Sequence, residues 1–398
     1  MPPTANLKIL VAHSAYQQRG GEDSVVETEI QLLRSFGHEV VEYRRDNASI
    51  DPTQRLNLLQ QTIWSRSSAR AIRELAHEHK PDVLHAHNTF PLLSPAIYWA
   101  AEQIGVPVVQ TLHNYRLLCA QAMFLRNGAV CEDCLGKLPW RGITRKCYRD
   151  SAPQSAALVG MLGLHRALGS YSSKVARYVA LSEFSKRKFV AGGIPAEKLV
   201  VKPNFADIVA PADGARVGAL FVGRLAEEKG LQVLLDALHM SPAVICTIVG
   251  EGPQRELVEA SQDVRFLGPS KQEQVYAQMR QASYLVMPSI CYEQFPRTLV
   301  EAFACGLPII ASRLGPLAEL IEDGETGLLF DAGSAQDLAS KIHFAEAHPD
   351  IMRQIGAKAR AEYEAKYTPQ RNYQRLMAIY MDAISVNKTQ LSLNYGTG

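Results

Sequence analysis

The feature that most constrains the fold is a regular alternation of strand-like and helix-like segments. In the first half, continuous apolar runs such as "LKILVAH" (7–13) alternate with segments such as "SVVETEIQLLRSFG" (24–37), whose apolar residues recur at helical spacing. The second half repeats this order from "ALFVGRL" (219–225) to "TGLLF" (326–330). Strands that alternate with helices predict parallel sheets covered by helices on both faces.

The alternation is interrupted once, in the Pro- and Ala-rich segment "NFADIVAPADGA" (204–215), which has no periodicity. We therefore predict an α/β protein with two doubly wound, Rossmann-like domains that face each other across a cleft. The predicted parts are residues 1–205, with a Cys-rich insertion at 115–150; residues 206–368; and residues 369–398, a C-terminal helix that packs back on the first domain, and a tail.

Composition and charge limit the class of protein. The chain has 398 residues, of which 47% are hydrophobic and 21% charged, as in a soluble globular protein. Its most membrane-like segment (155–170) contains His165 and Arg166 and is too short to span a bilayer. The N-terminus has no separate apolar stretch of the kind found in signal peptides. We therefore expect a cytoplasmic protein.

Two loops after predicted strands carry candidate binding residues. Gly20 and Gly21 precede a predicted helix, where backbone amides can approach a phosphate, although a simple tight turn explains them equally well. The dinucleotide pattern GxGxxG is missing there. In "VGRLAEEKG" (222–230), Arg224 ends a strand and Lys229 precedes the next helix. Two such cations can clamp a diphosphate, and the alternative is ordinary surface charge.

The segment "CYEQFPRTLVEAFACGLPIIAS" (291–312) contains the third candidate set. If a helix begins near Pro296, Glu293 lies in the loop before it and Glu301 lies about a turn and a half inside. The N–H groups of Phe295, Arg297 and Thr298 are then free for phosphate or sugar. Two carboxylates can form a hydrolytic pair, accept hydrogen bonds from sugar hydroxyls, or simply lie at the surface.

Several of these motifs together resemble a known family. "GRLAEEKG", "VGEGP", "VRFLG" and "YEQFPRTLVEAFACGLPIIAS" with "IEDGETGLLF" are similar to the donor domain of retaining GT-B glycosyltransferases, and more narrowly to glycosyltransferase family 4. "PDVLHAHN" and "TLHN" resemble the first half of that family less specifically. The resemblance implies a GT-B fold, with an acceptor-binding domain at 1–205 and a nucleotide-sugar-binding domain at 206–368.

The resemblance also implies roles for individual residues. Arg224 and Lys229 match the pair that binds the donor diphosphate, Glu293 matches the glutamate that holds the transferred sugar, and Glu301 matches the one that binds the ribose. His113 matches the histidine at the cleft wall beside the reacting sugar. The catalytic set is then His113, Arg224, Lys229 and Glu293. The donor-binding set is Gly20, Gly21, Glu251, Gly252, Leu267, Phe295, Pro296, Arg297, Thr298 and Glu301.

The activity implied is transfer of a hexosyl group, with retention, from a nucleotide-sugar to a glycan or lipid-linked acceptor in cell-surface polysaccharide or glycoconjugate synthesis. The chain contains no Asp-x-Asp, so we expect no cofactor to be required for catalysis. The alternatives are a nucleotide-sugar epimerase or a phosphorylase of the same fold, or an NAD-dependent oxidoreductase, which the missing GxGxxG disfavours.

Histidines and cysteines are the candidate metal ligands. His85 and His87 alternate in "HAHN", and with no third ligand nearby we expect histidines that line the cleft or pack in the core; His13 ends the first strand. Four cysteines of the insertion, one pair of them in a C-x2-C, suit a structural zinc site or reduced, packed thiols. They are Cys119, Cys131, Cys134 and Cys147.

Charge is distributed unevenly along the chain. Residues 1–205 contain 25 Lys and Arg against 17 Asp and Glu, although the net charge of the whole chain is only +2. Five of the cations flank Trp140 in the insertion: Lys137, Arg141, Arg145, Lys146 and Arg149. Basic clusters with an interfacial tryptophan are typical of peripheral contact with an anionic membrane. We expect such contact at the inner face of the cytoplasmic membrane, and no nucleic-acid partner.

Overall fold

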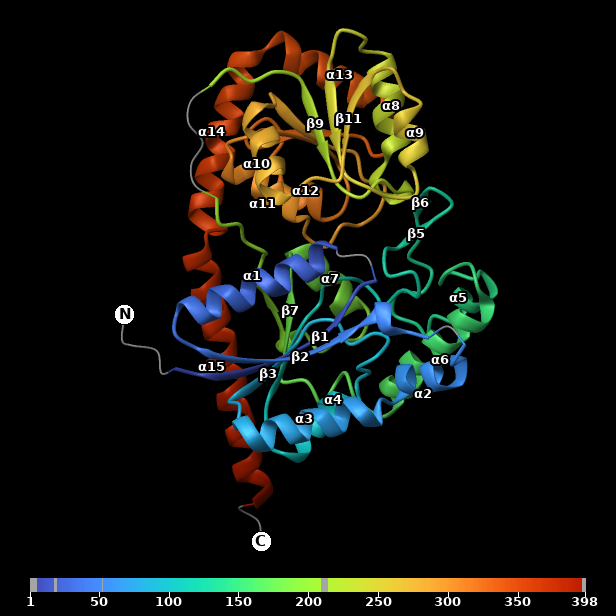
Figure 1. The fold of residues 1–398 in the computed structure, drawn as a ribbon, viewed down its shortest axis with the longest axis vertical. Helices are drawn as coiled ribbons and strands as arrows, with labels where there is room; N and C mark the ends of the chain where they lie inside the picture. Colours follow the sequence, from blue (N-terminus) through green and yellow to red (C-terminus); the bar gives the residue numbers. More distant parts are fainter. Residues whose placement is uncertain (1–5, 18–19, 52, 209–213, 396–398) are drawn as a thin grey trace. The chain divides into compact units, whose positions relative to one another are not determined.

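The computed structural model describes residues 6–17, 20–51, 53–208 and 214–395. The chain forms two compact units (Figure 1). Unit 1 comprises Met1–Ala122, Glu132–Pro203 and Tyr373–Gly398, and unit 2 comprises Met123–Cys131 and Asn204–Asn372. Structural similarity to known proteins, reported below, establishes the fold class predicted from the sequence.

Unit 1 is built on a six-stranded parallel sheet with the strand order β2-β1-β3-β4-β7-β8. The inner strands β3 and β4 are fully buried, as expected for a sheet covered on both faces. The strands are β1 (Lys8–Ala15), β2 (Glu39–Asp46), β3 (Val83–Ala86), β4 (Val108–Thr111), β7 (Arg177–Ala180) and β8 (Leu199–Val201).

Helices of unit 1 connect these strands. Helices α3 and α4 pack against each other, as do α5 and α6 and also α2 and α6. From Tyr373 onward, the C-terminal helix α15 belongs to unit 1. The helices are α1 (Gly21–Ser35), α2 (Arg55–Ile63), α3 (Arg66–His79), α4 (Ala96–Gln103), α5 (Arg141–Thr144), α6 (Ala152–Ala167), α7 (Glu183–Ala191) and α15 (Pro369–Tyr395), with 3-10 turns η1 (Asn47–Ser49) and η2 (Ala196–Lys198).

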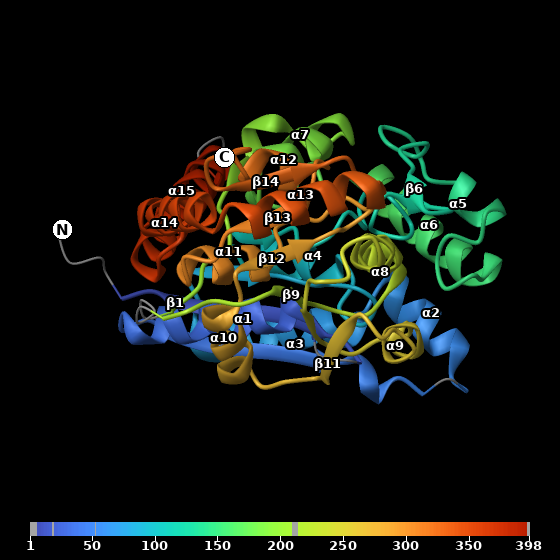
Figure 2. The same ribbon diagram turned by 90° about the horizontal axis from the view of Figure 1, so that it is seen from above.

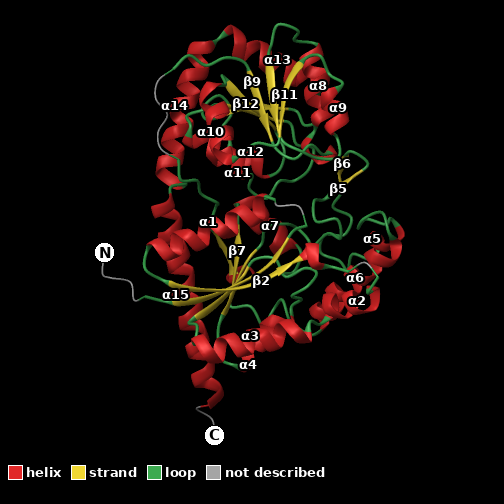
Figure 3. Cartoon of the chain, viewed as in Figure 1, coloured by secondary structure: helices red, strands yellow, loops and turns green. Residues whose placement is uncertain are grey.

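Unit 2 contains a second six-stranded parallel sheet, with the order β11-β10-β9-β12-β13-β14. This is the order of a Rossmann-type sheet. Helices lie around the strands in Figure 3. The strands are β9 (Ala219–Val222), β10 (Cys246–Val249), β11 (Val264–Gly268), β12 (Tyr284–Met287), β13 (Ile309–Ser312) and β14 (Gly327–Phe330).

The core of unit 2 joins its sheet to helices α8 and α13, which pack against each other (Figure 2). On α8, Leu231, Leu234 and Leu238 are fully buried at helical spacing. The helices of this unit are α8 (Leu231–His239), α9 (Arg255–Glu259), α10 (Gln272–Gln281), α11 (Arg297–Ala304), α12 (Pro316–Leu320), α13 (Ala335–Ala347) and α14 (Pro349–Lys366), with the 3-10 turn η3 (Glu227–Lys229).

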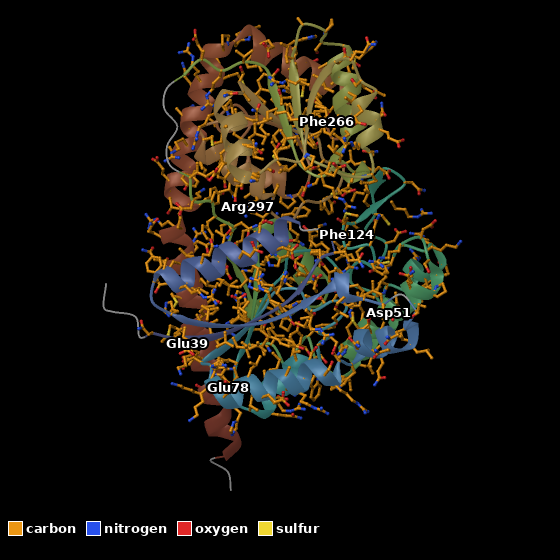
Figure 4. All side chains as sticks on the ribbon, viewed as in Figure 1. Glu39, Asp51, Glu78, Phe124, Phe266 and Arg297 are labelled. Carbon is orange, nitrogen blue, oxygen red and sulfur yellow. The ribbon has the colours of Figure 1, made fainter. Side chains whose placement is uncertain are left out.

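The structure differs from the predicted division in the Cys-rich insertion. Residues 123–131 belong to unit 2, although the insertion was expected to belong wholly to the first domain. They form a hairpin of β5 (Leu125–Arg126) and β6 (Ala129–Val130) around Asn127 and Gly128, which both have positive φ, as a tight Asn-Gly turn requires. Phe124 is buried and its ring meets that of Tyr292 edge-on at 6.1 Å (Figure 4).

Candidate functional site

The strand order of unit 2 places its candidate residues at one edge of the sheet. Strands β9 and β12 are neighbours, although two strands and their helices separate them in the sequence. The order of the strands reverses at this pair, and such a switch point is where open α/β sheets bind ligands, beyond the carboxyl ends of the strands. The loop after β9 contains Arg224 and Lys229, and the loop after β12 contains Glu293.

Lys229 and Glu293 form the central ion pair of this site. Nζ of Lys229 lies 2.5 Å from Oε1 of Glu293, and Oγ of Ser289 donates to the same oxygen at 2.7 Å. Burial disfavours both charges, but each charge stabilises the other. The Lys229 ammonium and the Ser289 hydroxyl therefore hold the pKa of Glu293 below its usual value, and Glu293 holds the pKa of Lys229 above its usual value. The site thus contains a fixed cation and a fixed carboxylate at neutral pH.

Glycine allows the two loops to approach this closely. Gly230 has φ +69°, and a Cβ on it would lie 1.9 Å from the carbonyl oxygen of Pro288 in the other loop. No other residue fits this position without moving one of the loops. The N–H of Ile290 donates to the carbonyl oxygen of Glu228 at 3.0 Å, which joins the same two loops a second time.

Glu301 lies inside α11, as expected, and is buried. Its Oε1 lies 2.9 Å from Nε of Arg297, at an angle outside hydrogen-bond geometry, and accepts a hydrogen bond from the Tyr276 hydroxyl at 3.2 Å. Burial raises the pKa of Glu301 despite the Arg297 guanidinium. Arg297 is labelled in Figure 4.

The remaining donor residues of the prediction also lie in unit 2. Arg224 is the most exposed, with 61% of its side chain accessible, and it lies 3.8 Å from Glu228. Gly252 follows β10, and a Cβ on it would lie 2.3 Å from the carbonyl oxygen of Leu225, in the loop after β9. Glu251 forms an ion pair with Arg255, and Leu267 lies in β11.

The start of α11 offers main-chain groups rather than side chains. Phe295 is buried, its ring packs against Tyr367, and its carbonyl oxygen accepts from Asn204. Pro296 is the N-cap of the helix and has no N–H. The N–H groups of Arg297 and Thr298, in the first turn, therefore provide the positive end of the helix dipole for an anion.

Gly20 and Gly21 belong to unit 1, whereas the donor set above belongs to unit 2. The N–H of Gly20 donates to Oδ2 of Asp23 at 2.9 Å, so this end of α1 is already capped by a carboxylate. Glu22 adds a second acidic residue to the first turn, and burial raises its pKa to about 7. The capped, acidic helix start argues against phosphate binding by Gly20 and supports the alternative, a turn.

His113 also lies in unit 1, where it contacts His87. Nε2 of His113 lies 2.9 Å from Nδ1 of His87, and burial is the main reason why the pKa values of both lie well below the usual value for histidine. The two rings stack at 5.2 Å between centroids. His113 lines a small cavity of unit 1 together with Asn88, Phe90, Gln110, Asn114 and Arg116. Arg116 lies 4.7 Å from the centre of the Phe90 ring.

The structure corrects the expectation that His85 and His87 have no third ligand nearby. Because side chains two apart in a strand share a face, both histidines meet Glu29 of α1. The three residues bring one candidate ligand atom each within 4.8 Å of one another, and all are buried. However, the Lys202 ammonium lies 2.8 Å from the other oxygen of Glu29. That positive charge opposes a second cation, so we interpret the group as a buried ion pair with histidines.

His13, like His85 and His87, lies beside a buried carboxylate. It is buried at the end of β1, and its Nε2 lies 2.8 Å from Oδ1 of Asp23. Hydrogen bonds from His13 and from the Gly20 amide hold the pKa of Asp23 below its usual value, although burial acts in the other direction. Nδ1 of His13 is buried without a hydrogen-bond partner.

The four cysteines of the insertion are free and half-buried. Among the described residues, the histidine and glutamate group above is the only set of three candidate ligands within 4.8 Å of one another, so Cys119, Cys134 and Cys147 of unit 1 do not form such a set.

Sequence reasoning missed residues that act on the predicted ones. Ser289 ends "YLVMPS" and holds Glu293, while Tyr276 of α10 holds Glu301. Glu29 and Lys202 are far apart in the sequence, and no spacing connects them. Only Ser289 had a local signal, its place at the carboxyl end of a strand.

Comparison with known proteins places both halves of the chain. Residues 19–209 match the family model "Glycosyltransferase Family 4", and residues 210–362 match "Glycosyl transferases group 1". D-inositol 3-phosphate glycosyltransferase of Streptomyces bingchenggensis is 27% identical over 318 residues, which are 71% of this chain and 63% of that protein. The chain therefore spans less than two thirds of that relative's length.

Two further similarities cover more of the chain. Phosphatidyl-myo-inositol mannosyltransferase of Mycolicibacterium smegmatis is 26% identical over 84% of this chain and 83% of that protein. HepE from Anabaena, in its crystal structure in complex with UDP-glucose, is 20% identical in sequence to this chain. The two structures match with a TM-score of 0.67 over 95% of this chain and all of HepE. The two halves of the chain thus match glycosyltransferase family models, and the fold of the chain is that of the GT-B glycosyltransferases.

Proposed function

We propose that the protein transfers a hexosyl group, with retention, from a nucleotide-sugar to a glycan or lipid-linked acceptor in the synthesis of a surface polysaccharide or glycoconjugate. The observation that carries the proposal is the Lys229–Glu293 pair at the switch point of the second sheet. A fixed cation suits the diphosphate of a donor, and a fixed carboxylate suits the hydroxyls of its sugar.

The donor fits the other residues of unit 2 in the same way. A diphosphate beside Lys229 can also use the exposed Arg224 guanidinium and the free N–H groups at the start of α11. The Glu301 carboxylate can accept from a ribose hydroxyl. The HepE structure contains UDP-glucose, which supports a uridine nucleotide as the first donor to test.

In the proposed mechanism, the glycosidic bond breaks through an oxocarbenium-like transition state and the departing phosphate accepts the acceptor's proton. Negative charge then grows on the phosphate, so the cations of unit 2 provide the main electrostatic stabilisation. Glu293, held as a carboxylate by Lys229 and Ser289, orients the sugar. No step requires a metal ion.

The acceptor is assigned to unit 1. Its cavity combines His113 with amide side chains and one guanidinium, which suits a polyol or an anionic acceptor. Two relatives are named for an inositol phosphate and a phosphatidylinositol acceptor, and both names are compatible with this chemistry.

A donor panel tests the proposal. We expect nucleotide release from one or a few nucleotide-sugars, accelerated by a polyol or lipid-linked acceptor, and an anomeric configuration in the product that matches the donor by NMR. Turnover without any acceptor would favour an epimerase, and turnover that requires inorganic phosphate would favour a phosphorylase. A nicotinamide fluorescence change on titration, with no release from any nucleotide-sugar, would instead support an oxidoreductase.

We further propose that unit 1 contacts an anionic membrane carrying the acceptor. The outer face of α6 is apolar and exposed at Gly160, Leu164 and Leu168. Leu138 lies against this helix, because a Cβ on Gly163 would be 3.2 Å from its Cδ1. Trp140 follows, 55% exposed. No helix in the described ranges is long and apolar enough to cross a bilayer.

The structure reduces the number of cations available to that surface. Asp133 lies 3.7 Å from Arg141 and 2.5 Å from Arg145 and so offsets part of their charge. Lys137, Lys146 and Arg149 remain exposed. At about 1 kcal/mol for each cation, these three contribute a factor of roughly 100 in binding.

Liposome sedimentation separates a membrane contact from simple solvation. Binding should require anionic vesicles, weaken with salt, and fall roughly 100-fold in K137Q/K146Q/R149Q. The matched control R265Q/K271Q/R280Q removes three exposed charges from unit 2 and should bind like the wild type. Equal loss in both triple variants, or no binding at low salt, would refute the contact.

A further inference from the structure

The contact between His87 and His113 depends on which of their ring nitrogens carry a hydrogen. The low pKa values leave both imidazoles neutral at neutral pH, so each ring has one N–H. The 2.9 Å contact between Nδ1 of His87 and Nε2 of His113 needs one hydrogen, since two lone pairs or two hydrogens would repel. The pair therefore has two arrangements, with either His87 or His113 as the donor.

Glu29 distinguishes these two arrangements. Its Oε2 accepts from the Lys202 ammonium at 2.8 Å, and this partner, with His85, holds the pKa of the buried carboxyl below its usual value although burial acts in the other direction. Its Oε1 is buried, makes no hydrogen bond of normal geometry, and lies 3.2 Å from Nδ1 of His85 and 3.5 Å from Nε2 of His87. An ionised oxygen so placed attracts an N–H and repels a lone pair.

The charge of Glu29 therefore places the hydrogen of His87 on Nε2. Nδ1 of His87 then has a lone pair and accepts from Nε2–H of His113. His113 is left with a bare Nδ1, which has no hydrogen-bond partner in the described part of the chain.

We propose that Glu29 and His87 are positioning residues that hold His113 in the tautomer whose Nδ1 accepts a hydrogen bond from a substrate hydroxyl. This inference deepens the proposed function and rests on it for the identity of the substrate, a sugar or polyol. His113 lines the cavity of unit 1, so its accepting nitrogen is the one left for a ligand there.

His85, the other histidine near Glu29, does not determine which tautomer His113 adopts. Nδ1 of His85 lies 2.7 Å from the Tyr380 hydroxyl, and its Nε2 lies 2.8 Å from the Thr111 hydroxyl. The two hydroxyls can donate or accept, and Oε1 of Glu29, 3.2 Å from Nδ1 of His85, favours a hydrogen on that nitrogen. In the described part of the chain, the nitrogens of His85 bond these hydroxyls and not His87 or His113. Tyr380 is therefore a suitable control position, because its hydroxyl lies in the same buried group but does not determine the tautomer of His113.

We call this coupling of Glu29 to His113 through His87 the relay, and Glu29→Gln tests it directly. The Lys202 ammonium only donates, so it turns the amide oxygen of Gln toward itself and the NH2 toward the histidines. His87 should then accept at Nε2 and donate from Nδ1, and His113 should carry its hydrogen on Nδ1. Long-range 1H–15N correlation spectra of protein with 15N-labelled histidine distinguish the two tautomers, and His113→Asn identifies the signals.

The expected result is a pyridine-like Nδ1 of His113 in the wild type and a pyrrole-like Nδ1 in E29Q. The kcat of E29Q should fall at least tenfold while the KM for the nucleotide-sugar changes less than threefold. Y380F should keep the wild-type tautomer and stay within twofold of wild-type kcat. If E29Q does not fold, E29M/K202M removes both charges together and should give a mixture of tautomers.

The tautomer of His113 and the proposed function can be refuted separately. A pyrrole-like Nδ1 of His113 in the wild type, or an unchanged tautomer in both Glu29 variants, overturns the relay whatever the activity. The expected tautomers together with no turnover on any nucleotide-sugar leave the relay intact and overturn the proposed function. The expected tautomers with undiminished kcat in E29Q overturn the positioning role.

Discussion

Replacing Lys229 by Met tests the donor site most sharply, because it separates stability from chemistry. The ammonium lies 2.5 Å from Oε1 of Glu293, and the two side chains are 25% and 13% exposed. Without Lys229, Glu293 keeps only the Ser289 hydroxyl as a partner in this pair. An unpaired, largely buried carboxylate costs about 1–3 kcal/mol, so we expect the free energy of unfolding to fall by about this amount.

The effect on turnover should be larger than the effect on folding explains. Losing one preformed charge at a departing phosphate costs about 2.7–4 kcal/mol in the transition state, or 10²–10³ in kcat. The double variant K229M/E293Q removes both charges and should recover most of the lost stability, because no unpaired carboxylate remains. It should recover none of the turnover.

Urea unfolding and nucleotide release measure the two quantities on the same preparations. Lys358→Met is the matched control, since Lys358 forms an exposed ion pair with Glu325 in the same unit and should change neither quantity by much. A kcat of K229M within threefold of the wild type would refute the donor assignment. Turnover restored in K229M/E293Q would show that the unpaired Glu293 carboxylate, and not the loss of a cation at the phosphate, impairs K229M.

Three further predictions concern other parts of the molecule. Glu301→Gln should raise the KM for the donor about tenfold and change kcat less, because Glu301 is assigned to the ribose, which it binds equally in the ground state and in the transition state. Steady-state kinetics check this. Burial lowers the pKa of His85 to about 4, against about 6.5 in the unfolded chain. The stability associated with neutral His85 is therefore complete above pH 6.5 and falls by about 3 kcal/mol as the pH drops to 4. His85→Asn should reduce the pH dependence of urea-derived stability across that window, while His87 and His113, whose pKa values are also lowered, retain their part of it. Packed thiols predict no stoichiometric zinc in elemental analysis and turnover that survives EDTA, whereas one zinc per chain would establish the thiolate site.

The sequence by itself determined the order of strands and helices along the chain. Apolar runs and helical periodicity are local properties, so β1, α1 and β9 appear within a few residues of their predicted ranges. Glu293 and Glu301 were placed correctly around the start of α11 for the same reason, because Pro296 favours a helix start. Local signals were weaker for α2 and the β5–β6 hairpin, which the sequence did not reveal.

Only the tertiary structure decided which charges meet. Lys229 and Glu293 are 64 residues apart, and they meet because the loops after the parallel strands β9 and β12 lie at one edge of a sheet. Glu29 and Lys202 are 173 residues apart, and they meet because helix α1 packs in unit 1 near the end of β8. The same fold showed that Gly20 lies at a helix start already capped by Asp23. It also brought Glu29 to His85 and His87, a third side chain that no spacing in the sequence predicts. Protonation states follow from such long-range pairing and burial, and for that reason they could not be derived from the order of residues.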